Sequence, residues 1–238
     1  MVRATIVYLF VAIYVAFAAP VALTWSAITR RPGLIYLLAR MCVAVAGRLC
    51  GIRLDVQGRE RISPDQTYLF LSNHQGNFDG PILYYASGRD LRALVKQEMM
   101  RLPILSLALR QVGFIPIDRA DPVRARASID RGAQHLREGL SYLAFPEGTR
   151  SRDGKLGPFK KGVFFMAIKA GVPIVPVTLN NSRLIQPPHS YGIRPATVQL
   201  VFHDPIPTAG LSVADRDELV HKTRLAISSA LREPDVSL

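Results

Sequence analysis

The sequence predicts an α/β protein: a mixed, largely parallel sheet flanked by helices and preceded by an N-terminal membrane-associated helical pair. Two observations predict this fold class. Over residues 51–238, short β-rich runs alternate with stretches of helical period, which is typical of strands joined by crossover helices. Before them, residues 4–28 contain no charged side chain, and a second apolar stretch follows. We therefore expect membrane-anchoring helices at 1–50 and one further domain at 51–238.

The first apolar run is longer than the about 20 residues needed to cross a bilayer core. A cleaved signal peptide is the competing interpretation, since residues 16–18 resemble a small-x-small cleavage site. The apolar run continues well past that site, which favours an anchor. Arg30 and Arg31 close the run and outnumber Arg3. By the positive-inside tendency, the rest of the chain is expected on the cytoplasmic side of the cell membrane.

The second apolar stretch has a helical period, with Arg40 and Arg48 lying off the apolar stripe. A core helix and an interfacial helix, with its arginines at lipid phosphates, both fit this pattern. Beyond Gly51 the turn and capping residues delimit the elements. Strands are expected at 52–56, 67–71, 91–95, 114–117, 141–145, 174–179 and 198–202, and helices at 81–86, 102–112, 123–138, 163–170 and 212–231.

The charge balance points to anionic partners. The 238 residues carry a net charge of +12, and the isoelectric point is about 10.2. A membrane surface, nucleic acid or phosphorylated small molecules would all match such a charge. The sequence has no zinc-finger spacing, RNA-binding signature or basic-aromatic repeat, so we expect no nucleic-acid partner. Cys42 and Cys50 both lie in an apolar segment and indicate neither a disulfide framework nor a metal site.

The candidate catalytic pair lies directly after the strand expected at 67–71, in the stretch SNHQGNFD at 72–79. His74 can act as a general base near neutral pH, and Asp79 can hold its tautomer. Residues five apart lie about 140° apart on a regular helix. We therefore expect His74 in a loop and Asp79 in the first turn of the next helix. No serine nucleophile accompanies the pair, so it would activate a hydroxyl that the substrate brings. The alternative is a loop histidine bonded to an N-capping aspartate.

Three basic residues follow other expected strands: Lys96, Arg119 and Arg150. A guanidinium binds phosphate oxygens in a bidentate way that lysine cannot copy. Together these side chains could bind a phosphomonoester, with Gly148 allowing close backbone approach and Thr149 offering a donor. Taken one at a time, each arginine could instead be a surface residue paired with a nearby acid, as Arg119 with Asp121.

The order and spacing of four blocks resemble the glycerolipid acyltransferase family, most closely its 1-acylglycerol-3-phosphate acyltransferase branch. The blocks are His-x4-Asp at 74–79, Gly-x4-Asp-Arg at 113–119, FPEGTRS at 145–151 and VPIVPV at 172–177. The resemblance extends to Lys96 and to FKKG at 159–162. FPEGTRS is highly specific, whereas the first and fourth blocks alone are not.

This resemblance implies transfer of a fatty acyl group from acyl-CoA or acyl carrier protein to the free hydroxyl of 1-acylglycerol 3-phosphate, forming phosphatidic acid. The domain at 51–238 would then be the catalytic domain. His74 would deprotonate the acceptor hydroxyl, and Asp79 would orient it. The second and third blocks would bind the phosphorylated acceptor, and the fourth would shape the acyl pocket. The implied substrate-binding residues are Lys96, Arg119, Glu147, Gly148, Thr149, Arg150 and Pro176.

Several points stay open at this level. As an anion, Glu147 suits hydrogen bonding within the site, or holding an arginine, better than phosphate binding. Backbone amides near Gly76 are candidates for the oxyanion donors. We expect no metal or cofactor, because a thioester is already activated. Gly76 stands where many members carry serine, and Pro116 where an aromatic is frequent. The alternatives are another acceptor (glycerol 3-phosphate, another lysophospholipid or a lyso-ornithine lipid) and a lipid-binding protein without catalysis.

Overall fold

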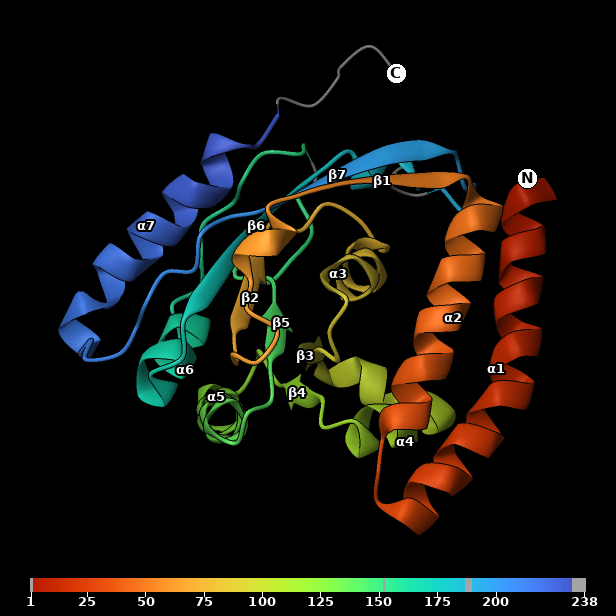
Figure 1. Ribbon diagram of the computed structural model, residues 1–238, viewed down its shortest axis with the longest axis horizontal. Helices are drawn as coiled ribbons and strands as arrows, with labels where there is room; N and C mark the ends of the chain where they lie inside the picture. The colour runs from red at the N-terminus through yellow and green to blue at the C-terminus, as the bar shows by residue number, and fades with distance from the viewer. Residues whose placement is uncertain (1, 152, 187–189, 233–238) are drawn as a thin grey trace.

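The structure is a computed structural model that describes residues 2–151, 153–186 and 190–232. It opens with two long antiparallel helices, α1 (Val2–Thr29) and α2 (Gly33–Cys50), which lie side by side at one side of the molecule (Figure 1). The later α-helices are α3 (Asp79–Ser87), α4 (Pro103–Gln111), α5 (Pro122–Arg137), α6 (Gly162–Ala170) and α7 (Arg216–Ser229). Short 3-10 turns occur at η1 (Arg59–Arg61), η2 (Gln97–Arg101), η3 (Ser182–Leu184) and η4 (Val213–Asp215).

One seven-stranded sheet forms the centre, in the order β1-β7-β6-β2-β5-β3-β4. The strands are β1 (Ile52–Gln57), β2 (Leu69–Ser72), β3 (Arg92–Lys96), β4 (Ile115–Ile117), β5 (Tyr142–Ala144), β6 (Ile174–Asn180) and β7 (Ala196–Phe202). Neighbouring strands are parallel except β6 and β7. The central strand β2 has β5 on one side and β6 on the other, so loops from two separate crossovers meet at its carboxyl end. Such a switch point is where open α/β sheets bind ligands.

Each face of the sheet has its own apolar core. On one face, Phe70, Val175 and Phe202 pack with residues of α3 and with the start of α1. On the other, Leu71, Phe164 and Leu219 join strands to α5, α6 and α7. Figure 1 shows this division, with α3 lying between the sheet and the pair α1/α2. The hydrophobic residues at alternate strand positions therefore go to opposite layers, as expected for a sheet covered on both faces.

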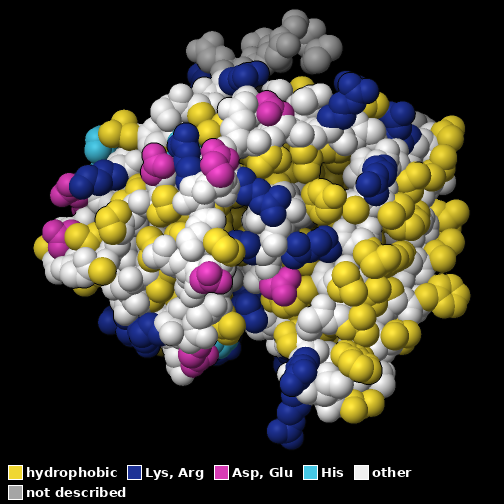
Figure 2. All heavy atoms as spheres, viewed as in Figure 1, with side chains coloured by type: hydrophobic (Ala, Val, Ile, Leu, Met, Phe, Trp, Pro, Cys, Tyr) yellow, Lys and Arg dark blue, Asp and Glu magenta, His cyan; other side chains and the backbone are white. Residues whose placement is uncertain are grey.

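Helices α1 and α2 leave much of their apolar surface uncovered. Both are long and apolar enough to cross a membrane, with mean hydropathies of 2.4 and 1.6. Phe17 and Ile28 of α1 are 76% and 77% exposed. The space-filling view shows hydrophobic side chains covering the side of the molecule where these helices lie (Figure 2). An exposed apolar surface of this kind is typical of contact with lipid.

The predicted fold class is confirmed, and each expected strand and helix beyond residue 51 is present within a few residues of its predicted bounds. The last helix shows the largest difference. Ser212 does cap it, but through a capping box on the 3-10 turn η4, so that α7 itself begins at Arg216. The change from the helical pair to the sheet falls between Cys50 and Ile52. Cys50 is buried in the core and Cys42 is half-buried.

Gly58 is the glycine whose replacement should cost the fold most. Its φ is +75°, and an added Cβ would lie 2.0 Å from the carbonyl oxygen of Phe202. Gly171 has a similar φ of +65° with nothing within 4 Å of an added Cβ. Gly171→Ala should therefore cost only the left-handed conformation, about 1–2 kcal/mol of unfolding free energy. Gly58→Ala should cost about 3–5 kcal/mol, because the backbone must also move. Denaturant unfolding of both variants checks this, and equal losses would contradict it.

Candidate active site

The register of the central strands brings the first and third sequence blocks together. Leu71 of β2 is paired with Ala144 of β5 in a parallel ladder. His74 and Glu147 each lie three residues beyond that pair, so the two loops run side by side. Accordingly, the backbone N–H of His74 donates to Glu147 Oε1 over 2.9 Å. The two segments are 73 residues apart in the chain and become neighbours only through the sheet.

His74 and Asp79 form the predicted pair. His74 lies in the loop after β2, and Asp79 is the first residue of α3. The distance from His74 Nδ1 to Asp79 Oδ2 is 2.7 Å, and the Asp79 side chain is fully buried. A carboxylate only accepts hydrogen bonds, so Nδ1 carries the hydrogen and the neutral ring presents a lone pair on Nε2. The imidazole is 22% exposed, which leaves it within reach of a substrate.

One oxygen of Asp79 organises the whole turn. Besides His74, Oδ2 accepts the backbone N–H groups of Gln75 at 2.6 Å and Gly76 at 2.9 Å. Those two amides are therefore occupied and are not free to serve as oxyanion donors, whereas the expectation for other amides near Gly76 stays a prediction. Oδ1 has no hydrogen-bond partner among the described residues. An added Cβ on Gly76 would lie 3.5 Å from Oδ1, so the serine that this position lacks could donate to it.

Glu147 holds the histidine loop from the other side. In addition to His74, its carboxylate accepts the N–H of Gly157 at 2.8 Å. Burial raises the pKa of Glu147, while the hydrogen bonds from His74 and Gly157 and the charge of Arg224 act in the opposite direction. The expected hydrogen bonding within the site is present. No arginine forms an ion pair with Glu147 in the part of the chain that the structure describes, and the alternative that it holds one stays a prediction.

A residue of the last helix secures the same loop. Arg224 of α7 donates to the carbonyl oxygens of Gly157 at 2.5 Å and Leu156 at 2.8 Å. Its guanidinium also lies 5.4 Å from the ring centroid of Phe159. The C-terminal helix thereby fixes the peptide whose amide supports Glu147, and through Glu147 the backbone of His74.

The structure gives the predicted phosphate-binding residues different partners. Arg119 donates to the carbonyl oxygen of Gly148, not to Asp121 as the surface alternative supposed. Lys96 is exposed and forms an ion pair with Glu98 over 2.9 Å. Thr149 is exposed on the same turn as Gly148 and Arg150. Pro176 lies within β6, paired in register with Leu71, and is buried.

Arg150 begins a chain of hydrogen bonds that ends on the first helix. It donates to Asn77 Oδ1. The Asn77 amide donates to Gln186 Oε1 at 2.8 Å, and Gln186 Nε2 donates to the hydroxyl of Tyr8 at 3.0 Å. The apolar helix α1 is therefore bonded, through two amide side chains, to the arginine of the FPEGTRS block.

The structure adds residues that the sequence argument missed. The ring of Phe145 stacks on His74 with centroids 4.0 Å apart and planes 15° apart. Lys160 lies against Gly148, since an added Cβ there would be 3.1 Å from its Nζ. FKKG at 159–162 was a signal for Lys160, and Phe145 opens a block already singled out. For Arg224 and Asn77 the residue types alone carry no such signal.

The fold and this site belong to the acyltransferase class of proteins, as the comparison with known families shows. The model of the acyltransferase family matches residues 53–180, more than half of the chain, and the chain therefore belongs to this family. It is similar to a chloroplastic 1-acyl-sn-glycerol-3-phosphate acyltransferase of Brassica napus, at 38% identity over 156 residues. It is also similar to a 1-acyl-sn-glycerol-3-phosphate acyltransferase of Borreliella burgdorferi, at 34% identity over 149 residues.

The sequence matches cover only part of each chain, whereas the structural match covers the whole fold. The first match covers 65% of this chain and 45% of the relative, and the second 63% and 60%. The crystal structure of the 1-acyl-sn-glycerophosphate acyltransferase of Thermotoga maritima superposes with a TM-score of 0.85. That superposition covers 100% of this chain and 96% of the other at 23% identity, which shows a shared fold.

The pKa of Glu147 yields a prediction for stability. A carboxyl whose pKa is raised on folding binds more protons folded than unfolded, so unfolding free energy falls as pH rises through the window above its ordinary 4.5. Glu147→Gln removes this dependence and leaves one of two backbone N–H groups facing an amide NH2, at a cost of about 1–3 kcal/mol. The advantage of the wild type over this variant should shrink as pH rises from 4.5 toward neutrality.

Denaturant unfolding across that pH range measures the difference directly. Glu60→Gln is the matched control, because Glu60 is exposed and the same charge is removed. The unfolding free energies of the wild type and of Glu60→Gln should differ little at every pH. If the stability advantage of the wild type over Glu147→Gln grew with pH, the raised pKa assigned to Glu147 would be wrong.

Proposed function

We propose that the protein transfers a fatty acyl group from acyl-CoA or acyl carrier protein to the free hydroxyl of 1-acylglycerol 3-phosphate, forming phosphatidic acid for phospholipid synthesis. The observation that carries this proposal is the 2.7 Å contact between His74 Nδ1 and a buried Asp79, beside the FPEGTRS loop. Membership in the acyltransferase family and the names of the relatives support it.

The geometry supports a direct transfer. His74 Nε2 takes the proton of the acceptor hydroxyl as its oxygen attacks the thioester carbonyl. Asp79 stabilises the imidazolium that results. When the tetrahedral intermediate collapses, the carbon–sulfur bond breaks, and the thiolate leaves with the proton that the imidazolium returns. General-base help supplies about 10²–10⁴-fold, so positioning of the two substrates must supply much of the remainder.

Basic groups near the loop would hold the acceptor phosphate. Arg150 is exposed, and its contact with Asn77 leaves further N–H groups of its guanidinium for a ligand. Lys160 lies beside Gly148 in the same loop. Arg119 is engaged with the carbonyl of Gly148 and so supports the loop. We assign phosphate binding to Arg150 with Lys160, and a supporting role to Arg119. Lys96 and Thr149 remain candidates for contacts at the edge of the acceptor site, and Pro176 for packing against the acyl chain.

The proposed lipid substrates and the apolar helices together favour a reaction that takes place at a membrane surface. Helices α1 and α2 would hold the enzyme at the cell membrane, with the sheet on the cytoplasmic side. The names of the plant relatives place those proteins in chloroplasts. Thioester chemistry of this kind runs without a metal or cofactor, and acyl-CoA or acyl carrier protein enters as co-substrate.

Asp79→Asn tests the pair while sparing the turn. An asparagine can place its carbonyl oxygen where Oδ2 accepts three donors, and its NH2 group where Oδ1 has no partner among the described residues. The loop should persist, but the charge that stabilises the imidazolium is lost. We expect kcat to fall by roughly 10²–10⁴-fold at nearly unchanged KM.

His74→Ala should abolish transfer with the fold intact, as judged by circular dichroism. If either variant keeps full activity, catalysis does not run through this pair. A protein that binds lysophospholipid but transfers nothing, even as wild type, would instead be a lipid-binding protein.

Arg150→Ala tests the acceptor assignment. A lost charge-assisted hydrogen bond to phosphate, about 1.5–3 kcal/mol, should raise KM for 1-acylglycerol 3-phosphate roughly 10- to 150-fold. KM for the acyl donor should not change. Arg126→Ala, an exposed arginine on α5, is the charge-matched control.

A panel of acceptors completes this test, with products identified by mass spectrometry. The wild type should prefer acceptors with a phosphate monoester and reject lyso-lipids without one, and Arg150→Ala should reduce that preference. An effect of Arg150→Ala confined to the acyl donor would exclude phosphate binding there. Equal use of glycerol 3-phosphate or lyso-ornithine lipid by the wild type would reassign the acceptor.

A further inference from the structure

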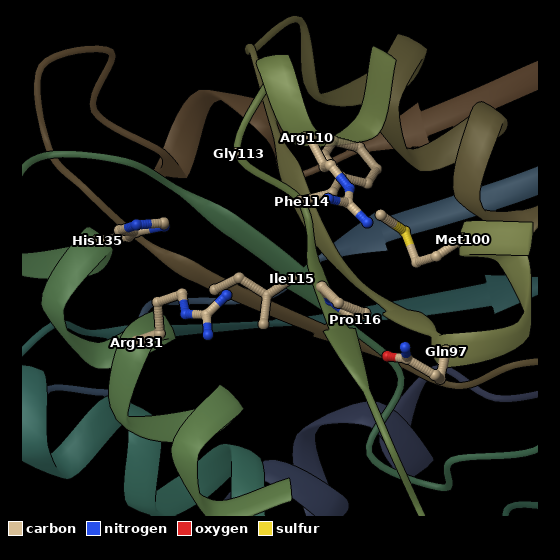
Figure 3. A pocket seen from close by; sticks show the side chains of 9 residues that line it. All are labelled: Gln97, Met100, Arg110, Gly113, Phe114, Ile115, Pro116, Arg131 and His135. Atoms are coloured by element: carbon tan, nitrogen blue, oxygen red, sulfur yellow. The ribbon is translucent and has the colours of Figure 1, made fainter. Parts of the chain in front are cut away.

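A cavity lies at the β4 edge of the sheet, and neither His74 nor Asp79 lines it. Its volume is about 430 Å³, and its wall comes from η2, the end of α4, β4 and α5. Figure 3 shows Arg131 and His135 of α5 on one side, Arg110 beside Phe114, and Gln97 on the far side. None of the residues of the loops at 72–79 and 145–151 lines it.

Two arginines of the cavity wall, Arg110 and Arg131, form no ion pair among the described residues. Neither Arg110 nor Arg131 has a carboxylate oxygen within 4.0 Å in the described part of the chain. Arg124, on the same helix as Arg131, instead pairs with Asp118 at 3.5 Å and Asp121 at 3.2 Å. Two guanidinium groups without acidic partners at one cavity favour a phosphate-type anion, which they can bind in a bidentate way.

His135 leaves a further polar group free for a ligand. The hydroxyl of Tyr142 donates to the carbonyl oxygen of Gly113 at 2.6 Å. It has only one hydrogen, so its 2.6 Å contact with His135 must be a hydrogen bond donated by Nδ1. Nε2 of the neutral ring then carries a lone pair, so it can accept a hydrogen bond from a ligand hydroxyl but cannot donate one to a phosphate.

An exposed apolar helix adjoins the cavity. Leu102, Ile104 and Leu107 are 58%, 58% and 48% exposed, and Arg110 follows Leu107 by three residues on the same helix face. Arg110 can therefore extend from an apolar stripe toward a polar surface.

This stripe continues the surface of the N-terminal helices. Helix α4 contacts α1, and Tyr36 of α2 donates to the carbonyl oxygen of Val112 at the end of α4. The three helices also meet in Figure 1, at the end of the molecule where α1 turns into α2.

We propose that the cavity and α4 form a binding site for an anionic phospholipid. Its phosphate lies between Arg110 and Arg131, and its acyl chains lie along Leu102, Ile104 and Leu107. The arginines without acids, the adjoining apolar stripe and its continuity with α1 and α2 favour a lipid over a free anion. Residues 113–116 of the second sequence block form part of its wall, whereas the loops at 72–79 and 145–151 do not line it, and the site does not depend on the function proposed above.

Native mass spectrometry of the full chain in an uncharged detergent tests the site. Short-chain phosphatidylglycerol is the probe, and phosphatidylcholine of the same chain length is the neutral comparison. The double variant Arg110→Gln/Arg131→Gln should bind phosphatidylglycerol roughly 10- to 30-fold more weakly, because each basic group near an anionic lipid contributes about fivefold. Leu107→Asn should also weaken binding of this lipid. The double arginine variant should change binding of phosphatidylcholine much less, because that headgroup carries no net charge.

The control is Arg53→Gln/Arg126→Gln, which removes the same charge from exposed positions elsewhere. It should bind phosphatidylglycerol like the wild type. Equal weakening in both double variants would show a general charge effect and overturn the proposal. Loss of binding in Arg150→Ala but not in the cavity variant would place the lipid at the acyl-transfer site instead. Full competition by inorganic phosphate, with no effect of Leu107→Asn, would show a free-anion site and equally overturn it.

Discussion

The site depends on a single carboxylate oxygen, Oδ2 of Asp79. It accepts the imidazole N–H and two consecutive backbone N–H groups, all within a fully buried position at the start of α3. The same contacts that shape the turn also select the tautomer of His74. A buried carboxylate is costly without partners, and three donors at one oxygen offset that cost. Structure and chemistry therefore rest on one group, which explains how a loop rich in small and polar residues can present a well-oriented imidazole.

The second support comes from distant parts of the chain. Glu147 binds the backbone of His74 and of Gly157, and Arg224 binds the carbonyl groups of that second segment. Arg224 lies on α7, beyond the residues 53–180 that match the family. The imidazole thus sits between two buried carboxylates, one on its ring and one on its backbone. Because each carboxylate is held by backbone N–H groups, the geometry is fixed before any substrate arrives.

Much of this architecture could be predicted from the sequence. The alternation of apolar runs predicted the strands, and the five-residue spacing placed His74 in a loop and Asp79 in a first turn. The partners of Glu147 and Arg119 could not be predicted, because they depend on which strands become neighbours. His74 and Glu147 meet because β2 and β5 pair in register, and no local pattern encodes that pairing. The role of Arg224 could not be predicted either. An arginine in an amphipathic helix has many possible partners, and the sequence does not show which distant segment lies beside it.

The hydrogen-bonded route from Tyr8 to Arg150 has a mechanical consequence. It passes through Gln186 and Asn77, both on loops, so a tilt or lift of the first helix moves the side chains that orient the guanidinium. Arg150 directly precedes Ser151, whose backbone N–H donates to the carbonyl oxygen of His74 at 2.7 Å. A displacement of the first helix would therefore be felt next to the loop that carries the imidazole.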